Sequence, residues 1–353
     1  MRADYCRYVL KFKQPAGTSR GVLLEKETYF LRLEDENNPG VFGIGECAVF
    51  RGLSADDVPG YEDKLKELCR NISRDEATDL QNYPSIMFGL QTAIYDISNG
   101  GRMLPFPSAF TDGQSGIPIN GLVWMGTKDE MLARIREKIG AGFTTIKLKV
   151  GAIDFESELE LVKYIRSHYS AEDLTIRLDA NGGFTPGNAL QRLEAFSKYG
   201  IHSIEQPIKA GQWEDMRRLC DNSPIDIALD EELIGLFTPE KMSGMLDAVK
   251  PKYIILKPSL IGGFSGAQMW MQLAAVRGIG GWITSALESN VGLNAIAQWT
   301  ARMGADMPQG LGTGALYVNN IASPLEVVGD SLRYDPSKSW SFPDFVWKSP
   351  KLT

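Results

Sequence analysis

The spacing of apolar residues predicts two kinds of structure, with a change of pattern near residue 117. Before it, segments with alternating or β-branched apolar residues are followed by two amphipathic patterns. The expected strands are 5–13, 21–33 and 41–47, and the expected helices are 61–71 and 85–98. Five Pro and Gly residues between 105 and 118 predict a linker. The N-terminal part is therefore expected to be a mixed α+β unit.

After the linker, short apolar segments alternate with amphipathic helical patterns. The expected strands are 119–123, 145–150, 174–178, 203–204, 227–229, 253–256 and 282–284, and the helical stretches include 128–139, 155–168, 187–199 and 267–277. Strands that alternate with helices are typical of βαβ units and a parallel sheet.

One polar residue stands at or just after the end of an apolar segment in each of six predicted strands, at intervals of about 25 to 30 residues: Lys149, Asp179, Glu205, Asp230, Lys257 and Ser285. A TIM barrel uses about 30 residues per βα unit and gathers the carboxyl ends of its strands on one face. An open doubly wound sheet would spread these ends along a line. The spacing therefore favours an α/β barrel in which these side chains meet.

Three of the six are acids, and three carboxylates directed at one point repel each other unless a cation lies among them. Oxygen ligands without His or Cys favour Mg²⁺, with Mn²⁺ able to substitute. The alternative for any single acid is that it caps the following helix. Three acids at matched spacing, flanked by lysines, favour a metal site at Asp179, Glu205 and Asp230.

Lys147 and Lys149 are separated by one residue, so a strand places both on the same face. Two ammonium groups beside a cation disfavour each other's charge, so one can be neutral and accept a proton. The alternative is that the two lysines form the polar outer face of an edge strand. The apolar residues between and around them do not alternate as such a face would require. Lys257 ends a strand on the far side of the barrel and is expected to face the opposite side of a substrate.

Composition and charge disfavour several classes of partner and mechanism. The chain has 353 residues, 43% of them hydrophobic, and a net charge of −7, which argues against nucleic acid or an anionic membrane as a partner. No membrane span or signal peptide is expected. Four scattered cysteines suggest a reducing cytoplasm. Only His168 and His202 are present, so mechanisms that need several histidines are disfavoured.

The order Lys-x-Lys, Asp, Glu, Asp, Lys resembles the enolase superfamily, in its muconate-lactonizing subgroup, over nearly the whole chain. The resemblance implies a modified TIM barrel, (β/α)₇β, at residues 114–319. It also implies an α+β capping domain at 1–113, completed by the C-terminal tail from about 320 to 353. The segments 43–47 and 51–54 resemble the capping-domain loop that covers the pocket, with an ordinary turn as the alternative.

Within the superfamily, segments 117–124, 177–182, 256–264 and 285–293 resemble the o-succinylbenzoate synthase family of menaquinone biosynthesis. The resemblance implies a Mg²⁺-dependent lyase that removes water from a small-molecule carboxylate. Lys149 would be the base, Lys257 would stabilise the enediolate, and Lys147 would orient the carboxylate. The candidate substrate-binding residues are Ser259, Ser285, Gly312, Asn181 and Arg51.

Two other functions remain open. An N-succinylamino acid racemase or dipeptide epimerase uses the same metal and lysines. Dipeptide epimerases of the subgroup carry an Asp-x-Asp near the last strand, where residues 309–314 read Gln-Gly-Leu-Gly-Thr-Gly here. A non-catalytic barrel that only binds a ligand is a remote alternative, because it would not need the lysines. The sequence leaves the oligomeric state open.

Overall fold

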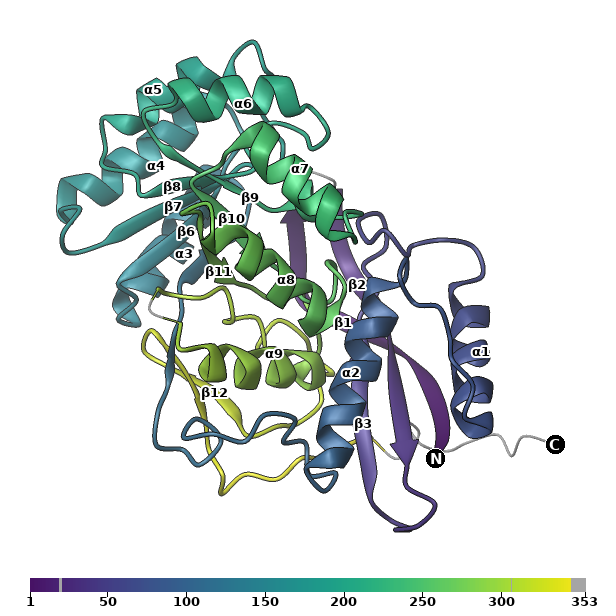
Figure 1. Ribbon diagram of the computed structural model, residues 1–353. Coiled ribbons are helices and arrows are strands. Elements are labelled where there is room, and N and C mark those ends of the chain that lie inside the picture. Colours follow the sequence, from purple (N-terminus) through teal and green to yellow (C-terminus); the bar gives the residue numbers. More distant parts are fainter. Residues whose placement is uncertain (19–20, 306, 344–353) are drawn as a thin grey trace.

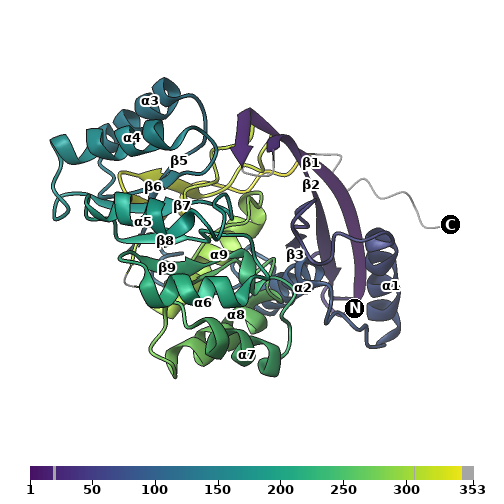
Figure 2. The same cartoon turned by 90° about the horizontal axis from the view of Figure 1, so that it is seen from above.

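The chain forms two units that pack against each other (Figure 1), as seen in a computed structural model that describes residues 1–18, 21–305 and 307–343. One unit is an antiparallel sheet with two helices, and the other is a parallel barrel with outer helices. Figure 2 shows from above that the N-terminal strands and helices stand to one side of the barrel. No helix among the described residues is long and apolar enough to cross a membrane.

The N-terminal sheet contains β1 (Arg2–Thr18), β2 (Gly21–Glu34) and β3 (Phe42–Cys47), in that order. Two helices follow, α1 (Tyr61–Arg74) and α2 (Pro84–Ser98), as the sequence pattern predicts. Alternation along β2 separates its two faces. Tyr29, Leu31 and Leu33 pack with residues of α1 and α2, whereas Phe30 belongs to the core shared with the barrel.

Two glycines allow β3 to lie directly on α2. A Cβ atom at Gly45 would stand 1.9 Å from the backbone oxygen of Gly89, and one at Gly43 would stand 2.0 Å from that of Ala93. Residues 43–47 therefore belong to a strand packed on a helix, neither to a turn nor to a loop over the pocket. The loop that reaches the pocket begins after them, at Phe50.

The barrel sheet runs in chain order through seven parallel strands. They are β5 (Gly121–Val123), β6 (Thr145–Lys149), β7 (Thr175–Asp179), β8 (Ser203–Glu205), β9 (Asp226–Leu229), β10 (Tyr253–Leu256) and β11 (Gly280–Ile283). An α-helix follows each: α3 (Lys128–Gly140), α4 (Phe155–His168), α5 (Ala189–Ser197), α6 (Trp213–Asn222), α7 (Pro239–Val249), α8 (Gly263–Ala275) and α9 (Asn290–Met303). A short 3₁₀ turn, η1 (Glu231–Leu233), precedes α7.

The segment at Gln309 and Gly310 closes the ring. Gln309 forms a parallel bridge with Ile119, and Gly310 forms one with Thr284, directly after β11. Backbone hydrogen bonds support both contacts, since the Asn120 nitrogen donates to the Gln309 oxygen at 3.0 Å. Seven βα units followed by this eighth segment form the (β/α)₇β barrel that was expected.

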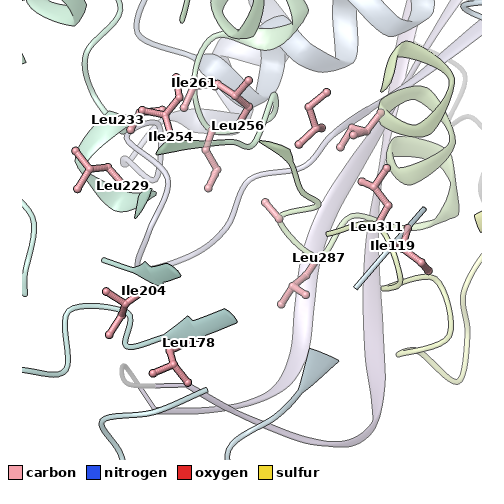
Figure 3. Packing of buried hydrophobic residues seen from close by; sticks show 14 of the residues in the cluster. Ile119, Leu178, Ile204, Leu229, Leu233, Ile254, Leu256, Ile261, Leu287 and Leu311 are labelled. Atoms are coloured by element: carbon pink, nitrogen blue, oxygen red, sulfur yellow. The ribbon is translucent and has the colours of Figure 1, made fainter. Parts of the chain in front are cut away.

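Alternation along the barrel strands separates an outer apolar layer from the interior. Leu178, Ile204 and Leu229 lie on successive strands in the main hydrophobic core (Figure 3). The interior positions carry a second small cluster around Ala228, Ile255 and Trp282. The residue two positions after each member is Asp230, Lys257 and Thr284. A small apolar cluster therefore lies one step below the polar ends of these three strands, with the Arg177 guanidinium 4.1 Å from the centre of the Trp282 ring.

The tail after residue 320 contacts both units. The hairpin of β12 (Leu325–Val328) and β13 (Ser331–Tyr334) pairs with β4 (Ile117–Pro118), the strand that leads into the barrel. The ring of Phe342, by contrast, lies 6.3 Å from that of Phe30 in the N-terminal unit. Residues 344–353 of the predicted tail lie outside the described residues. The domain boundaries at 113 and 319 stay a prediction.

A buried carboxylate fixes the N-terminal unit on the barrel. Glu46, near the end of β3, accepts hydrogen bonds from the Ser289 hydroxyl at 2.6 Å and from the backbone nitrogens of Ser289 and Gly292 at 3.0 and 2.9 Å. These groups form the N-terminus of α9, where free N–H groups favour a negative charge. The contact holds the segment after Glu46 above the barrel mouth.

Candidate active site

Three acids and three lysines converge at the carboxyl ends of the barrel strands. Asp179 ends β7, Glu205 ends β8 and Asp230 directly follows β9, and all three are buried. Lys147 and Lys149 lie on β6 and are also buried, and Lys257 directly follows β10. The structure therefore brings together the three acids and three lysines that the sequence analysis predicted for a metal site and its bases.

Ammonium groups and carboxylates alternate around this face. The Lys147 Nζ atom lies 2.8 Å from Asp179 Oδ2 and 2.5 Å from Glu205 Oε2. The Lys149 Nζ atom lies 2.6 Å from the same Asp179 oxygen and also donates to Asn181 Oδ1. These contacts join the ends of β6, β7 and β8 into one polar network.

Lys257 stands on the other side of the same network. Its Nζ atom donates to Asp230 Oδ2, so it pairs with the acid farthest along the strand order from Lys149. Both Lys149 and Lys257 line the same cavity. Two lysines can therefore reach a bound molecule from two sides.

Burial and neighbouring charge shift the protonation of these groups in different directions. Burial opposes the charge on Asp179, but Lys147 and Lys149 outweigh it and hold the pKa of Asp179 well below its ordinary value. Burial and the charge of Asp179 raise the pKa of Glu205 well above its ordinary value. Burial also opposes the charges on Lys147 and Lys257, but the adjacent carboxylates raise the pKa of both. The lysines thus compensate the charge of Glu205 less than that of Asp179.

The donor set fits a hard divalent cation. Glu205 Oε1 is buried and has no hydrogen-bond partner among the described residues, so a buried acceptor is left over. The three acids offer only oxygen ligands, which Mg²⁺ prefers. Within residues 1–18, 21–305 and 307–343, no three His, Cys, Asp or Glu side chains form a ready metal cage. The Lys147 ammonium lies between two of the carboxylates instead.

The two histidines lie away from this face. His168 is the last residue of α4, where it is exposed, and His202 directly precedes β8 and stacks on Tyr253 with ring centres 5.4 Å apart. Both positions belong to the opposite end of the barrel, where strands begin. Proton transfer at the strand ends therefore falls to the lysines and acids.

Three non-glycine residues near the same face have a strained backbone. Asn181, Gln206 and Leu287 have positive φ angles of 43°, 40° and 63°. Each follows a strand end, two residues after Asp179, one after Glu205 and four after the end of β11. Non-glycine residues adopt this conformation rarely, and they do so most often where the surrounding structure must hold a site in place.

One cavity spans the two units above these residues. Its lining includes Lys147, Lys149, Asn181, Lys257, Ser285 and Gly312 from the barrel, and Phe50 and Leu53 from the N-terminal unit. Of the predicted substrate-binding residues, Asn181, Ser285 and Gly312 therefore line the cavity. The capping loop contributes apolar side chains rather than the charge that was expected of it.

Ser259 and Arg51 lie outside the cavity lining. The Ser259 hydroxyl is fully buried and donates to Glu288 Oε1 at 2.5 Å, and Glu288 Oε2 accepts from the Ser285 hydroxyl at 2.5 Å. Ser259 therefore supports the cavity wall through Glu288. Arg51 is partly exposed and forms ion pairs with Glu27 and Asp57.

Several cavity residues were not among the predicted site residues. Phe50, Leu53, Leu122 and Trp124 give the cavity an apolar side, and Thr313 lies beside Gly312. Leu122 lies on β5 and Trp124 directly follows it, but neither is polar, so the search for polar residues at strand ends did not select them. Leu53 lies in segment 51–54, which was expected to resemble the capping-domain loop over the pocket, whereas Phe50 precedes that segment.

Comparisons with known proteins agree with this geometry. Residues 130–334 match a family model described as "Enolase C-terminal domain-like". The o-succinylbenzoate synthase of Desulfotalea psychrophila is 47% identical, over 94% of this chain and 98% of that protein. The crystal structure of MenC from Desulfotalea psychrophila LSv54 superposes with a TM-score of 0.84 and 44% identity, covering 94% and 99% of the two chains.

More distant relatives carry other activities as well. The hydrophobic dipeptide epimerase of Citrifermentans bemidjiense is 27% identical over 78% of both chains. The structure of o-succinylbenzoate synthase from Thermosynechococcus elongatus BP-1, complexed with Mg in the active site, has a TM-score of 0.69 and 25% identity over 88% of this chain and 92% of that one. The family model spans more than half of the chain, and the D. psychrophila enzyme matches nearly all of it. The chain therefore belongs to the enolase superfamily and, within it, to the o-succinylbenzoate synthase family.

Proposed function

We propose that this protein is a Mg²⁺-dependent lyase that converts 2-succinyl-6-hydroxy-2,4-cyclohexadiene-1-carboxylate to 2-succinylbenzoate, a step of menaquinone biosynthesis. The observation that carries the proposal is the ring of acids and lysines at the strand ends. The chain that holds them is 47% identical to the o-succinylbenzoate synthase of Desulfotalea psychrophila. Four free cysteines support a place in the reducing cytoplasm.

Asp179, Glu205 and Asp230 would hold the metal. Their oxygens are hard donors, and the unpartnered Glu205 Oε1 gives one of them a free lone pair. When bound, Mg²⁺ would supply a Lewis acid that neutralises negative charge on the substrate carboxylate. Mn²⁺ prefers similar oxygen ligands and would substitute for it.

Lys149 would move the proton. As a neutral amine it would accept the proton from the ring carbon that bears the carboxylate, and the electron pair of that C–H bond would pass into the carboxylate as an enediolate. The same ammonium group would then give the proton to the departing hydroxyl, which leaves as water. The electron pair returns to form the last ring double bond, and the product is aromatic.

Lys257 and Lys147 would act through their positive charges. Lys257 faces the cavity opposite Lys149, and the adjacent Asp230 keeps it protonated, so it would stabilise the enediolate electrostatically. Lys147 is likewise held cationic by Asp179 and Glu205, and it would orient the carboxylate. Neither residue needs to exchange a proton in this reaction.

The remaining cavity residues would bind the substrate skeleton. Asn181, Ser285 and the backbone near Gly312 offer hydrogen-bonding groups for the succinyl and carboxylate oxygens. Phe50, Leu53 and Trp124 offer an apolar surface for the six-membered ring.

The purified protein is expected to convert the cyclohexadiene carboxylate in the presence of Mg²⁺ and to lose this activity in chelator. The loss of the diene's ultraviolet absorbance measures the reaction directly. A panel of N-succinylamino acids and dipeptides, followed by optical rotation, is the matched comparison. Efficient racemisation with negligible dehydration would transfer the assignment to the epimerase branch, and activity that persists in chelator would contradict the metal site.

Replacing Asp179 or Asp230 by Asn, or Glu205 by Gln, is expected to abolish Mg²⁺ binding and turnover. Each change removes a negative oxygen ligand while leaving the barrel core intact, and loss of one ligand charge weakens a hard-cation site. Calorimetric titration with Mg²⁺ measures the binding. Asp226→Asn, at the exposed start of β9, is the control and is expected to bind metal like the parent. Unchanged affinity in all three site variants would rule out these ligands.

A further inference from the structure

Gln206 connects the ends of three neighbouring strands. It directly follows Glu205, it is 1% exposed, and its backbone has a φ of 40°. Its backbone nitrogen donates to the Ala228 oxygen at 2.8 Å, and its backbone oxygen accepts from the Gly182 nitrogen at 2.7 Å. The residue therefore contacts β9 on one side and the loop after β7 on the other.

The Gln206 side chain forms four further hydrogen bonds. Its Oε1 atom accepts from the backbone nitrogens of Asp230 and Glu232 at 3.2 and 3.3 Å. Its Nε2 atom donates to the Ile208 oxygen and to Glu232 Oε2, both at 3.0 Å. A side-chain amide offers two donors and one acceptor oxygen with two lone pairs, so the whole capacity of Gln206 is used.

These bonds begin where the sheet pairing stops. The register of β8 and β9 ends with Glu205 opposite Ala228, so Asp230 lies beyond the ladder. Its backbone angles, φ −120° and ψ −78°, belong neither to the strand nor to the following turn. The side chain of Gln206 supplies the acceptor for the Asp230 nitrogen that a longer strand would have supplied.

Glu232 extends the same connection into the loop after β8. Its Oε1 atom accepts from the Gly211 nitrogen at 2.7 Å, while its Oε2 atom accepts from Gln206. The segment 206–211 is thereby tied to the turn that begins at Asp230. Movement of either loop would change the separation of the Glu205 and Asp230 carboxylates.

We infer that Gln206 is a positioning residue that sets the geometry of the Glu205 and Asp230 carboxylates for a divalent cation. The inference rests on the proposed function, because it takes these acids as metal ligands. Gln206 is not among the residues that line the cavity. It acts on Asp230 through the backbone nitrogen and on Glu205 through direct chain connection. Hydrogen-bond partners that orient metal ligands typically contribute 10- to 100-fold in affinity.

A matched control exists elsewhere in the barrel. Gln298 on α9 is 0% exposed, donates to the Met103 oxygen and to Asn294 Oδ1, and accepts from the Phe106 nitrogen. It is as buried as Gln206 and its side chain forms three hydrogen bonds, but it contacts none of the proposed ligands. A Gln→Met change removes the hydrogen bonds at both positions while keeping the side-chain length.

Gln206→Met is expected to weaken Mg²⁺ binding by about 10- to 100-fold in calorimetric titration, whereas Gln298→Met is expected to bind Mg²⁺ like the parent. The Mn²⁺ electron paramagnetic resonance spectrum of Gln206→Met is expected to broaden, since the ligand geometry becomes less uniform. At saturating Mg²⁺, the KM for substrate is expected to remain close to that of the parent. Gln206→Asn is the milder variant, because Asn tolerates positive φ and its shorter amide cannot reach Asp230.

The outcomes separate the inference from the function on which it rests. If the parent binds no Mg²⁺ or Mn²⁺, the proposed metal site is wrong. If the parent binds metal and both Gln206 variants bind it equally well, the positioning role is wrong. The same conclusion follows if Gln298→Met weakens binding as much as Gln206→Met, because the effect would then be general destabilisation.

Discussion

Lys149→Arg is expected to lower kcat for dehydration by about 10³- to 10⁴-fold, close to the whole contribution of a general base. An arginine side chain keeps the positive charge beside Asp179, but its pKa lies above about 12, so it cannot accept the proton. Steady-state kinetics with the cyclohexadiene carboxylate measure the effect. Exchange of the substrate α-proton with D₂O should disappear together with turnover.

Two comparisons separate proton transfer from disturbance of the site. Lys163→Arg, at an exposed position of α4, should react like the parent. Mg²⁺ affinity should remain measurable in Lys149→Arg, because the three acids are unchanged. A Lys149→Arg variant that kept most of the parent's rate would assign the base to another residue.

The strand ends of the barrel were predictable because two physical patterns coincide there. Short apolar segments end at a polar residue, and the interval between them matches a βα unit. In the structure, Lys149 pairs with Asp179, and Lys147 pairs with both Asp179 and Glu205, which are contacts that no spacing rule specifies. The sequence thus predicts which strands supply the groups, and the packing decides which group contacts which.

Elements without a polar face were harder to predict. Every residue from Val291 to Thr300 in α9 is buried, so the helix lacks the alternation of apolar and polar faces that marks an amphipathic helix. The hairpin of β12 and β13 was missed for another reason. Gly329 and Asp330 form its two-residue turn, a recognised hairpin signal, but the strands on either side are short.

Residues that act through tertiary contacts gave the weakest signals. Glu288 joins the hydroxyls of Ser259 and Ser285, although the three residues come from two different loops. Ser259 was predicted to bind substrate, but its place in the sequence cannot show which way its hydroxyl points. Nothing in the sequence indicated the role of Gln206 either, because Asp230 and Glu232, which donate to its side chain, follow the next strand, more than 20 residues away.

Lys257→Arg is expected to keep measurable dehydratase activity, whereas Lys257→Met is expected to lose about 10²- to 10³-fold in kcat, the usual loss when a group that stabilises a developing oxyanion is removed. In this elimination the proton and the hydroxyl leave from the same side of the ring, where Lys149 stands. Lys257, on the other side, then needs only its charge. Arginine retains that charge, with a penalty that comes from its larger planar head group beside Asp230.

The same pair of variants distinguishes dehydration from racemisation. A two-base racemase needs Lys257 to donate and accept protons, so arginine would stop the reaction as completely as methionine. Both variants and the parent should therefore be assayed on the cyclohexadiene carboxylate and on N-succinylamino acids in D₂O. Equal inactivation of dehydration by Lys257→Arg and Lys257→Met would show that proton transfer, not charge, is what this position contributes. Retained dehydration in Lys257→Arg alone would mean that a single lysine carries the acid–base chemistry and that the second serves as a fixed cation.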